Sequence, residues 1–270
     1  EGALAKGARD MIVVLPDSKT VHNGSMYSSS VTTGDFENFI AHDLVTYIDA
    51  HYRTIAARES RGLVGHSMGG YGATRIGMKH ADVFGSLYIM SPCCLSARGA
   101  GPSNPANEKA LEAVKSPADS AKLPFGLRAQ LASAAAWSPD PKKPPLYLDL
   151  PVENGVARPD VVAKWAANAP LAFIDQYIGN LRQYKAIGID VGDHREIIAK
   201  RYRKNARQIA QPMAEPDNPY PHALSPFWSV FSESGLHFRG SNHDHAITRT
   251  PRHDFLAEAH SVNSFHNEKV

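Results

Sequence analysis

One short segment, Gly65-His66-Ser67-Met68-Gly69-Gly70, constrains the fold more than any other part of the chain. Residues 61–66 before it are apolar enough for a short buried strand, and residues 69–80 after it contain no proline and are typical of a helix. A strand joined to a helix through so few residues needs a tight turn, which small residues on both sides of Ser67 permit. The chain therefore contains a strand–turn–helix unit.

Strands and helices alternate along the rest of the chain. Residues 11–15, 84–90 and 185–191 are rich in β-branched and aromatic residues and are predicted strands. Apolar residues at helical spacing predict helices over about 36–48 and 159–181. This alternation is typical of an α/β protein with a mostly parallel sheet flanked by helices.

The alternation is interrupted once and changes character near the end. Residues 96–151 are rich in Pro, Ala and Ser, and we interpret them as a helical and loop insertion that caps the sheet. Because the pattern resumes afterwards, residues 1–270 are expected to form a single domain. The C-terminal segment is divergent, with a basic helix predicted over about 195–210 and a weak strand over 236–239.

Composition excludes several classes of protein. With 43% hydrophobic residues and a net charge of +2, the chain is neither disordered nor a fibre, and it lacks the basic surface of a nucleic-acid-binding protein. No apolar run is long enough to span a membrane. The two cysteines, Cys93 and Cys94, are adjacent, so they cannot build a spaced disulfide framework or a four-cysteine zinc site. We expect two packed thiols there rather than a strained disulfide ring. Oligomeric state and cellular location stay unassigned.

Ser67 is the predicted nucleophile, and the alternative interpretation is a glycine-rich turn without chemistry. A serine hydroxyl needs a histidine base, and that histidine needs a carboxylate to orient it. In the order Ser, acid, His, the acid is expected after the strand at 185–191, which indicates Asp193, although a solvated turn aspartate fits equally well. The base is His245 or His243. The backbone N–H of Met68 is expected to bind the oxyanion.

Other residues near this motif or among the late histidines have competing interpretations. Tyr27 and His66 are predicted substrate contacts, and ordinary packing is the alternative for Tyr27. A metal site could be built from the late histidines, but their spacing supports it poorly, so we predict no metal. Its members would be His243, Asp244, His245 and His253.

Several segments in order resemble the bacterial putative-esterase branch of the α/β-hydrolases, which includes feruloyl esterases and S-formylglutathione hydrolases. They are MIVVLPD, GSMYSSSVTTGD, FENFIAHDLVTYIDAHYRT, RESRGLVGHSMGGYGATRIGMKH, LYIMSPCCL, WSPDPKKPPLYLDLP and DVVAKWAANAPLAFIDQYIGNLRQYKAIGIDVGD. The resemblance extends from about residue 8 to 193. It implies a serine carboxylic ester hydrolase that forms an acyl-enzyme on a small-molecule ester, without a cofactor. The alternatives are an acyltransferase or peptidase on the same scaffold, or an inactive hydrolase-like binding protein.

The sequence differs from the family pattern in two places. Residues 11–15 would correspond to the fourth strand and residues 61–66 to the fifth, so the domain is expected to be N-terminally incomplete, without its first three strands. The family usually carries its acid at the position that Arg195 occupies here, which makes Asp193 a substitute. Asp244-His245 is the nearest match to the family's Asp-His motif.

Overall fold

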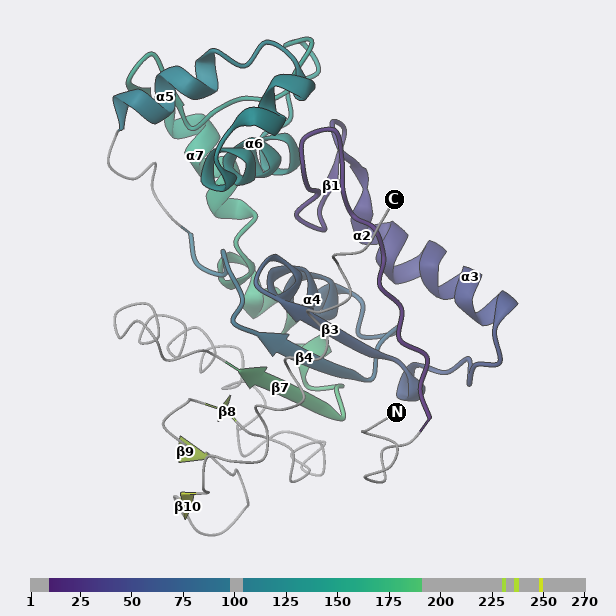
Figure 1. Cartoon of the computed structure of the whole chain (residues 1–270). Coiled ribbons are helices and arrows are strands. Elements are labelled where there is room, and N and C mark those ends of the chain that lie inside the picture. Colours follow the sequence, from purple (N-terminus) through teal and green to yellow (C-terminus); the bar gives the residue numbers. More distant parts are fainter. Residues whose placement is uncertain (1–9, 98–103, 191–229, 232–235, 238–247, 250–270) are drawn as a thin grey trace.

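The structure, a computed structural model, describes residues 10–97 and 104–190 together with the pairs 230–231, 236–237 and 248–249. Its centre is a four-stranded parallel sheet in the order β3-β4-β7-β8 (Figure 1). The strands are β3 (Gly62–His66), β4 (Ser86–Met90), β7 (Ala186–Asp190) and β8 (Val230–Phe231). Three of them match predicted strands, and their parallel pairing confirms the predicted α/β class.

Helix α4 (Met68–Lys79) carries the chain from β3 back to β4 and packs on one face of the sheet (Figure 1). Every residue from Gly70 to Met78 is buried. The facing side chains of β4 and β7, among them Leu87 and Ile187, form the main hydrophobic core with it. The predicted helix over 69–80 is therefore confirmed, and its burial keeps the turn that precedes it in one position.

The amphipathic helix that we predicted over 36–48 is present and extends to residue 51. It consists of α2 (Phe36–Asn38), a π-helical turn (Phe39–Asp43) and α3 (Leu44–His51). The Asp35 side chain accepts a hydrogen bond from the Asn38 N–H and so caps the start of α2. Glu37 ties α2 to α4 through ion pairs with Arg75 (2.8 Å) and Lys79 (2.7 Å).

The strand predicted at 11–15 was wrong. These residues form no strand, and Met11, Val13 and Leu15 are 69–86% exposed. Within the described residues, β3 pairs only with β4, and no strand lies beside residues 11–15. A run of β-branched residues becomes a strand only when a neighbour accepts its backbone hydrogen bonds and covers its side chains.

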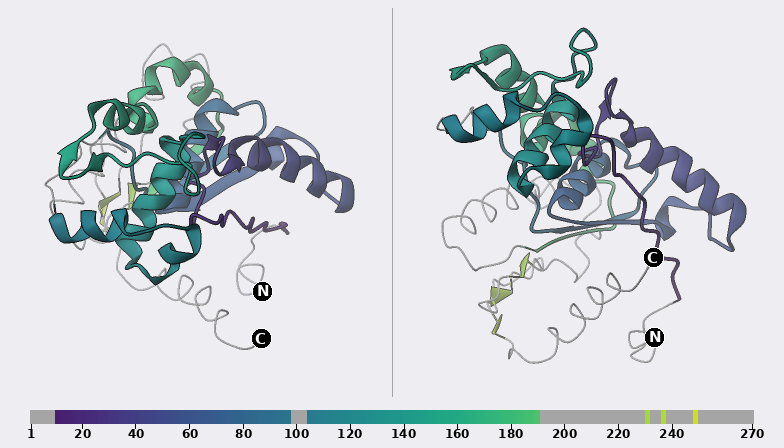
Figure 2. Two further views of the ribbon diagram at one scale, coloured as in Figure 1. Left: turned by 90° about the horizontal axis from the view of Figure 1, so that it is seen from above. Right: turned by 45° about the horizontal axis from the view of Figure 1, so that its top comes forward.

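The insertion forms a separate helical layer above α4 (Figures 1 and 2). Its elements are α5 (Pro105–Glu112), the 3-10 helix Pro117–Lys122 and α6 (Phe125–Trp137), and the hairpin of β5 (Val152–Glu153) and β6 (Val156–Ala157) comes directly after the insertion. Helix α7 (Pro159–Ala167) follows the hairpin and contributes Trp165 to the insertion's own hydrophobic core. The helix predicted over 159–181 is not continuous, because α7 ends at Ala167, shortly before Pro170. Two 3-10 turns (Pro170–Ala172 and Ile174–Tyr177) and α8 (Ile178–Leu181) follow.

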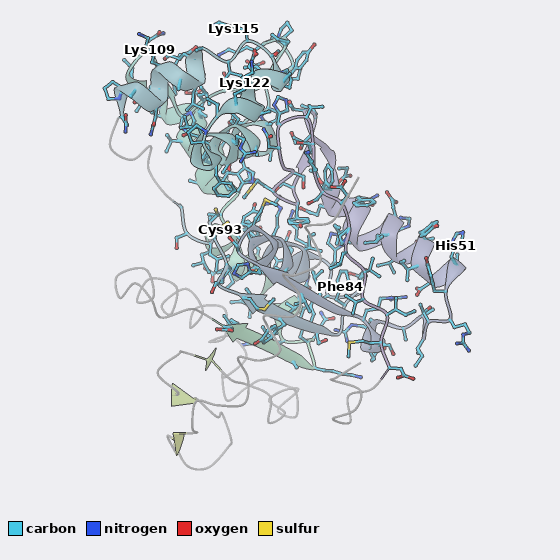
Figure 3. The ribbon with its side chains drawn as sticks, viewed as in Figure 1. His51, Phe84, Cys93, Lys109, Lys115 and Lys122 are labelled. Carbon is cyan, nitrogen blue, oxygen red and sulfur yellow. The ribbon has the colours of Figure 1, made fainter. Side chains whose placement is uncertain are left out.

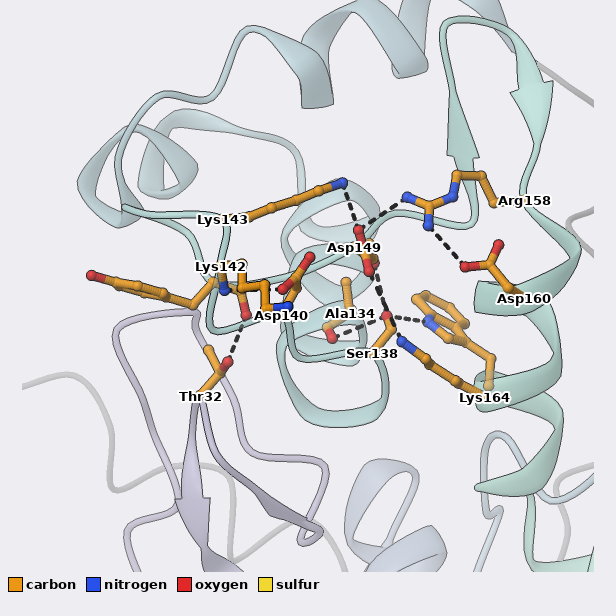
Figure 4. Close-up of polar contacts among 12 residues, drawn as sticks. Thr32, Ala134, Ser138, Asp140, Lys142, Lys143, Asp149, Arg158, Asp160 and Lys164 are labelled. Carbon is orange, nitrogen blue, oxygen red and sulfur yellow. Dashed lines mark hydrogen bonds and ion pairs between the residues drawn. The ribbon is translucent and has the colours of Figure 1, made fainter.

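A buried aspartate closes the loop between α6 and the hairpin (Figure 4). Asp149 accepts hydrogen bonds from Lys143 (2.6 Å) and Arg158 (3.0 Å). Burial alone would raise the pKa of this carboxyl, but these two cations outweigh it and hold the pKa below its usual value. The Ser138 hydroxyl donates to the Asp149 carbonyl at 2.7 Å and accepts from the Trp165 indole at 2.9 Å. This network joins the loop to α7.

The remaining described elements are the 3-10 turn Arg58–Ser60 before β3 and two small hairpins. Strands β1 (Ser29–Ser30) and β2 (Gly34–Asp35) lie beside α2, and β9 (Leu236–His237) pairs antiparallel with β10 (Thr248–Arg249). Strand β9 matches the start of the weak strand predicted at 236–239, whereas the predicted helix at 195–210 lies outside the described residues. None of the described helices is long and apolar enough to cross a membrane.

Candidate active site

Ser67 occupies the turn between β3 and α4 in a strained backbone conformation, with φ 54° and ψ −110°. A positive φ is uncommon for a residue with a side chain and persists only where the surrounding structure enforces it. Gly65 explains how the turn fits, because a Cβ atom there would lie 2.0 Å from the Gly69 carbonyl oxygen. The turn holds the exposed Ser67 at the carboxyl edge of the sheet.

Three backbone hydrogen bonds hold this turn. The Ser67 N–H donates to the Met90 carbonyl at 3.0 Å. The Ser67 carbonyl accepts from the Tyr71 N–H (3.1 Å) and from the Cys93 N–H (3.0 Å). The strained serine is thereby tied to the end of β4, to the first turn of α4 and to the loop that follows β4, so its position does not depend on the turn alone.

Met68 is the first residue of α4, so its N–H has no acceptor within the helix. The amino end of a helix carries partial positive charge, which favours a developing negative charge beside it. The side chain of Met68 packs beside the loop of residues 22–28, since its sulfur would lie 3.7 Å from a Cβ placed on Gly24. The predicted oxyanion donor, the Met68 N–H, thus lies directly after Ser67 at the amino end of α4.

The structure places the two predicted substrate contacts differently. His66 is exposed at the end of β3, immediately before Ser67. The ring of Tyr27 lies against α4, where a Cβ on Gly72 would come within 2.6 Å of it. The ring of Tyr27 thus packs on α4 and on the main hydrophobic core.

Behind Ser67 lies a buried polar network that the sequence did not reveal. The Tyr71 hydroxyl donates to the Asn168 carbonyl at 2.9 Å and lies 3.3 Å from the Ser28 hydroxyl. The Trp137 indole also donates to Ser28, at 3.3 Å, and Arg75 donates to Tyr71 at 3.4 Å. Burial raises the pKa of Tyr71, so the phenol stays neutral. No spacing rule signals such contacts, because they join α4 to residues that lie about 40 to 100 positions away in the sequence.

The predicted acid and bases, Asp193, His243 and His245, lie outside the described residues. The histidines of the rival metal site lie there too, and the described residues hold no group of three or more His, Cys, Asp or Glu side chains that could bind a metal. Strand β7 ends at Asp190, which is in register with Met90 and, through it, with His66. The chain therefore leaves β7 at the sheet edge that carries Ser67, about 10 Å away across two strand spacings.

Comparison with known proteins finds one matching family model. The family model described as "Putative esterase" matches residues 3–221. No curated protein matches the chain significantly.

Three solved structures are similar to part of the chain. A ferulic acid esterase is 21% identical with a TM-score of 0.41, and the match covers 72% of this chain and 54% of that one. The fluorophosphonate-binding serine hydrolase FphF of Staphylococcus aureus is 14% identical (TM-score 0.40, coverage 68% and 56%). The S-formylglutathione hydrolase FrmB of the same organism is 13% identical (TM-score 0.33, coverage 73% and 55%). The chain thus spans little more than half the length of each.

Proposed function

Since this chain belongs to the putative esterase family, whose model matches residues 3–221, we propose that it is a serine carboxylic ester hydrolase working through an acyl-enzyme on Ser67. The observation that carries the proposal is the strained backbone of Ser67, with φ 54° at the junction of β3 and α4. Strain of this kind is typical of nucleophiles that must stand clear of the sheet.

In the proposed reaction, the Ser67 oxygen attacks the acyl carbon of the ester while a histidine removes the hydroxyl proton. The Met68 N–H stabilises the oxyanion of the tetrahedral intermediate, and the alcohol leaves with the proton that the histidine returns. Water then attacks the acyl-enzyme by the same route and releases the acid. We assign the base to His245, with His243 as the second choice, and the orienting acid to Asp193.

Two observations support an acid after β7. Strands β3, β4 and β7 are parallel and in register, so the segments that follow β3 and β7 start at the same edge of the sheet. Functional groups in parallel α/β sheets gather at the carboxyl ends of the strands. Asp193 is three residues beyond the last residue of β7 and is therefore close enough in the chain to reach that edge.

The insertion is proposed to form one wall of the substrate site. Met68, Cys93 and Cys94 pack against a buried cluster that contains Trp137 of α6 and Met26 of the loop before β1. Trp137 also stacks at a tilt on Tyr71, with ring centroids 5.4 Å apart. Because α6 reaches the elements around Ser67 in this way, changes in the insertion are expected to alter which acyl or alcohol groups are accepted.

The test is covalent labelling of the folded protein with a fluorophosphonate, followed by intact mass measurement. One adduct per chain is expected for the wild type and for Ser60→Ala, whose exposed serine lies just before the opposite end of β3. Ser67→Ala should give no adduct and should lose hydrolysis of a short-chain aryl ester by several powers of ten. Labelling that persists in Ser67→Ala would refute the assignment, as would a folded wild type that does not react.

A further inference from the structure

We propose that Cys93 and Cys94 form a two-thiol site that chelates a thiophilic atom. Trivalent arsenic with one organic substituent is such an atom, because it can form two further bonds to sulfur. The chain has no other cysteine, so the site consists of these two residues alone. They follow β4 in the loop that also contacts Ser67. The proposal concerns a second site beside the nucleophile and does not depend on ester hydrolysis.

The geometry of the pair is unusual for neighbouring residues. Side chains of consecutive residues in extended chain point to opposite sides, which would separate the two sulfur atoms. Here Cys94 has φ +62°, and the loop contains a second positive φ at Ser91 (+38°). The turned backbone places both sulfur atoms on one side, with Sγ of Cys94 2.8 Å from Sγ of Cys93. The two sulfur atoms thus lie side by side, and a small outward rotation of the side chains would let both bind one central atom.

The spacing favours a shared ligand over a bond between the two sulfurs. Consecutive Cα atoms are about 3.8 Å apart, which is shorter than the roughly 4.4 Å at the lower end for ordinary disulfides. A disulfide here would close a small ring that includes the peptide bond between the two residues. A third atom between the sulfurs enlarges that ring, so both sulfurs can bind it with less distortion. Soft thiolate ligands suit a thiophilic centre of this kind.

The surroundings both hold the pair and leave it accessible. Cys93 and Cys94 are half-buried and pack against the cluster of Tyr71 and Trp137. Figure 3 shows Cys93 between α4 and the insertion. Packing on one side restricts the rotation of the side chains, while both residues stay partly exposed.

The binding step is redox-neutral. With phenylarsine oxide, two As–S bonds form, the bond between arsenic and oxygen breaks, and the two thiol protons leave with that oxygen as water. The arsenic keeps its oxidation state and its phenyl group. No oxidant or reductant is consumed, so the adduct should form in reducing buffer.

The first experiment measures binding by the folded protein in the presence of an excess of a monothiol. Intact mass should show one phenylarsenic adduct on the wild type, none on Cys93→Ser or Cys94→Ser, and release of the adduct by ethane-1,2-dithiol. The thermal midpoint of the wild type should rise with added reagent, since a ligand that prefers the folded chain stabilises it, and the midpoints of both variants should not move. An adduct on either variant would overturn the proposal. A thermal midpoint of the wild type that falls with added reagent would also overturn it, because it would mean that the unfolded chain binds the reagent and the folded chain does not.

A second experiment tests whether this site affects the nucleophile, and this consequence rests on the proposed function. The Cys93 N–H donates to the Ser67 carbonyl at 3.0 Å, so a ligand that fixes the Cys93–Cys94 peptide should disturb the strained turn. Loading with phenylarsine oxide is expected to slow fluorophosphonate labelling of the wild type several-fold and to leave the rate of Cys94→Ser unchanged. An equal rate in loaded and unloaded wild type would refute the coupling. Absence of labelling in both states would refute the proposed function but not the thiol site.

Discussion

Replacing Ser67 with glycine should give a more stable protein than replacing it with alanine, although both variants lack the nucleophile. The reason is the φ of 54° and ψ of −110° at this position. Alanine keeps the Cβ atom that is strained in this conformation, whereas glycine adopts positive φ without steric cost. Both variants lack the hydroxyl, so its loss does not contribute to the difference in stability between them.

The expected difference follows from two opposing contributions. Holding a residue with a side chain in a sparsely populated backbone region costs about 1–3 kcal/mol. Glycine loses more conformational freedom on folding and gives back about 0.5–1 kcal/mol. The glycine variant should therefore be more stable than the alanine variant by about 1 kcal/mol, the difference of the two contributions. In a chain of this size this corresponds to a thermal midpoint that is about 2–4 °C higher.

Urea unfolding measures the difference in free energy of unfolding between the two variants, provided that this free energy depends on urea concentration with the same slope in both. The matched control is Lys109 in the exposed face of α5, where Lys109→Gly should be less stable than Lys109→Ala by about 1 kcal/mol because the site is helical. The sign should thus reverse between the two positions. If glycine is the less stable variant at both positions, Ser67 is not strained and the argument that singles it out fails.

Two further predictions concern the supports of α4. Tyr71→Phe removes the buried hydroxyl that donates to the Asn168 carbonyl at 2.9 Å. It should lower the free energy of unfolding, measured in urea, by about 1–3 kcal/mol. The control is Tyr47→Phe at a residue that is 54% exposed, and an equally small change in both variants would contradict the prediction. Burial raises the pKa of the Glu37 carboxyl, but the nearby His80, Lys79 and Arg75 side chains outweigh burial and lower this pKa to about 2 in the folded protein, from its ordinary value of 4.5. Its contribution to stability should be present above pH 4.5 and lost as the pH falls through about 2, so Glu37→Gln should flatten the stability–pH curve in that window. If stability depends on pH with the same slope in the wild type and in Glu37→Gln over this range, the prediction is wrong.

The strand–turn–helix unit could be predicted because each of its signals is local. All of these signals lie within about 20 consecutive residues: the apolar run of β3, the glycine at position 65 and the absence of proline in α4. The structure shows why glycine stands there, since a side chain would meet the Gly69 carbonyl. The parallel sheet was predictable for a related reason: a strand that is followed by a helix returns to the sheet in the same direction.

The segment 11–15 shows where local signals are insufficient. Its composition is as typical of a strand as that of β3, yet Leu15 is 86% exposed. Composition records only that a segment suits a sheet, whereas a strand forms only where another strand offers hydrogen-bond partners. Whether such a partner is present depends on residues far away in the chain.

The sequence by itself thus determined the class of the fold and the position of the strained serine, and its resemblance to known proteins indicated the family. The fold class and the turn depend on short-range steric rules and on periodicity, which act through neighbouring residues. Only the tertiary structure decided that Tyr71 contacts Ser28 and Asn168 and that the Cys93 N–H holds the Ser67 carbonyl. Such contacts join residues that are distant in the sequence, and they arise only once the helix has packed on the sheet and the loops have closed around it.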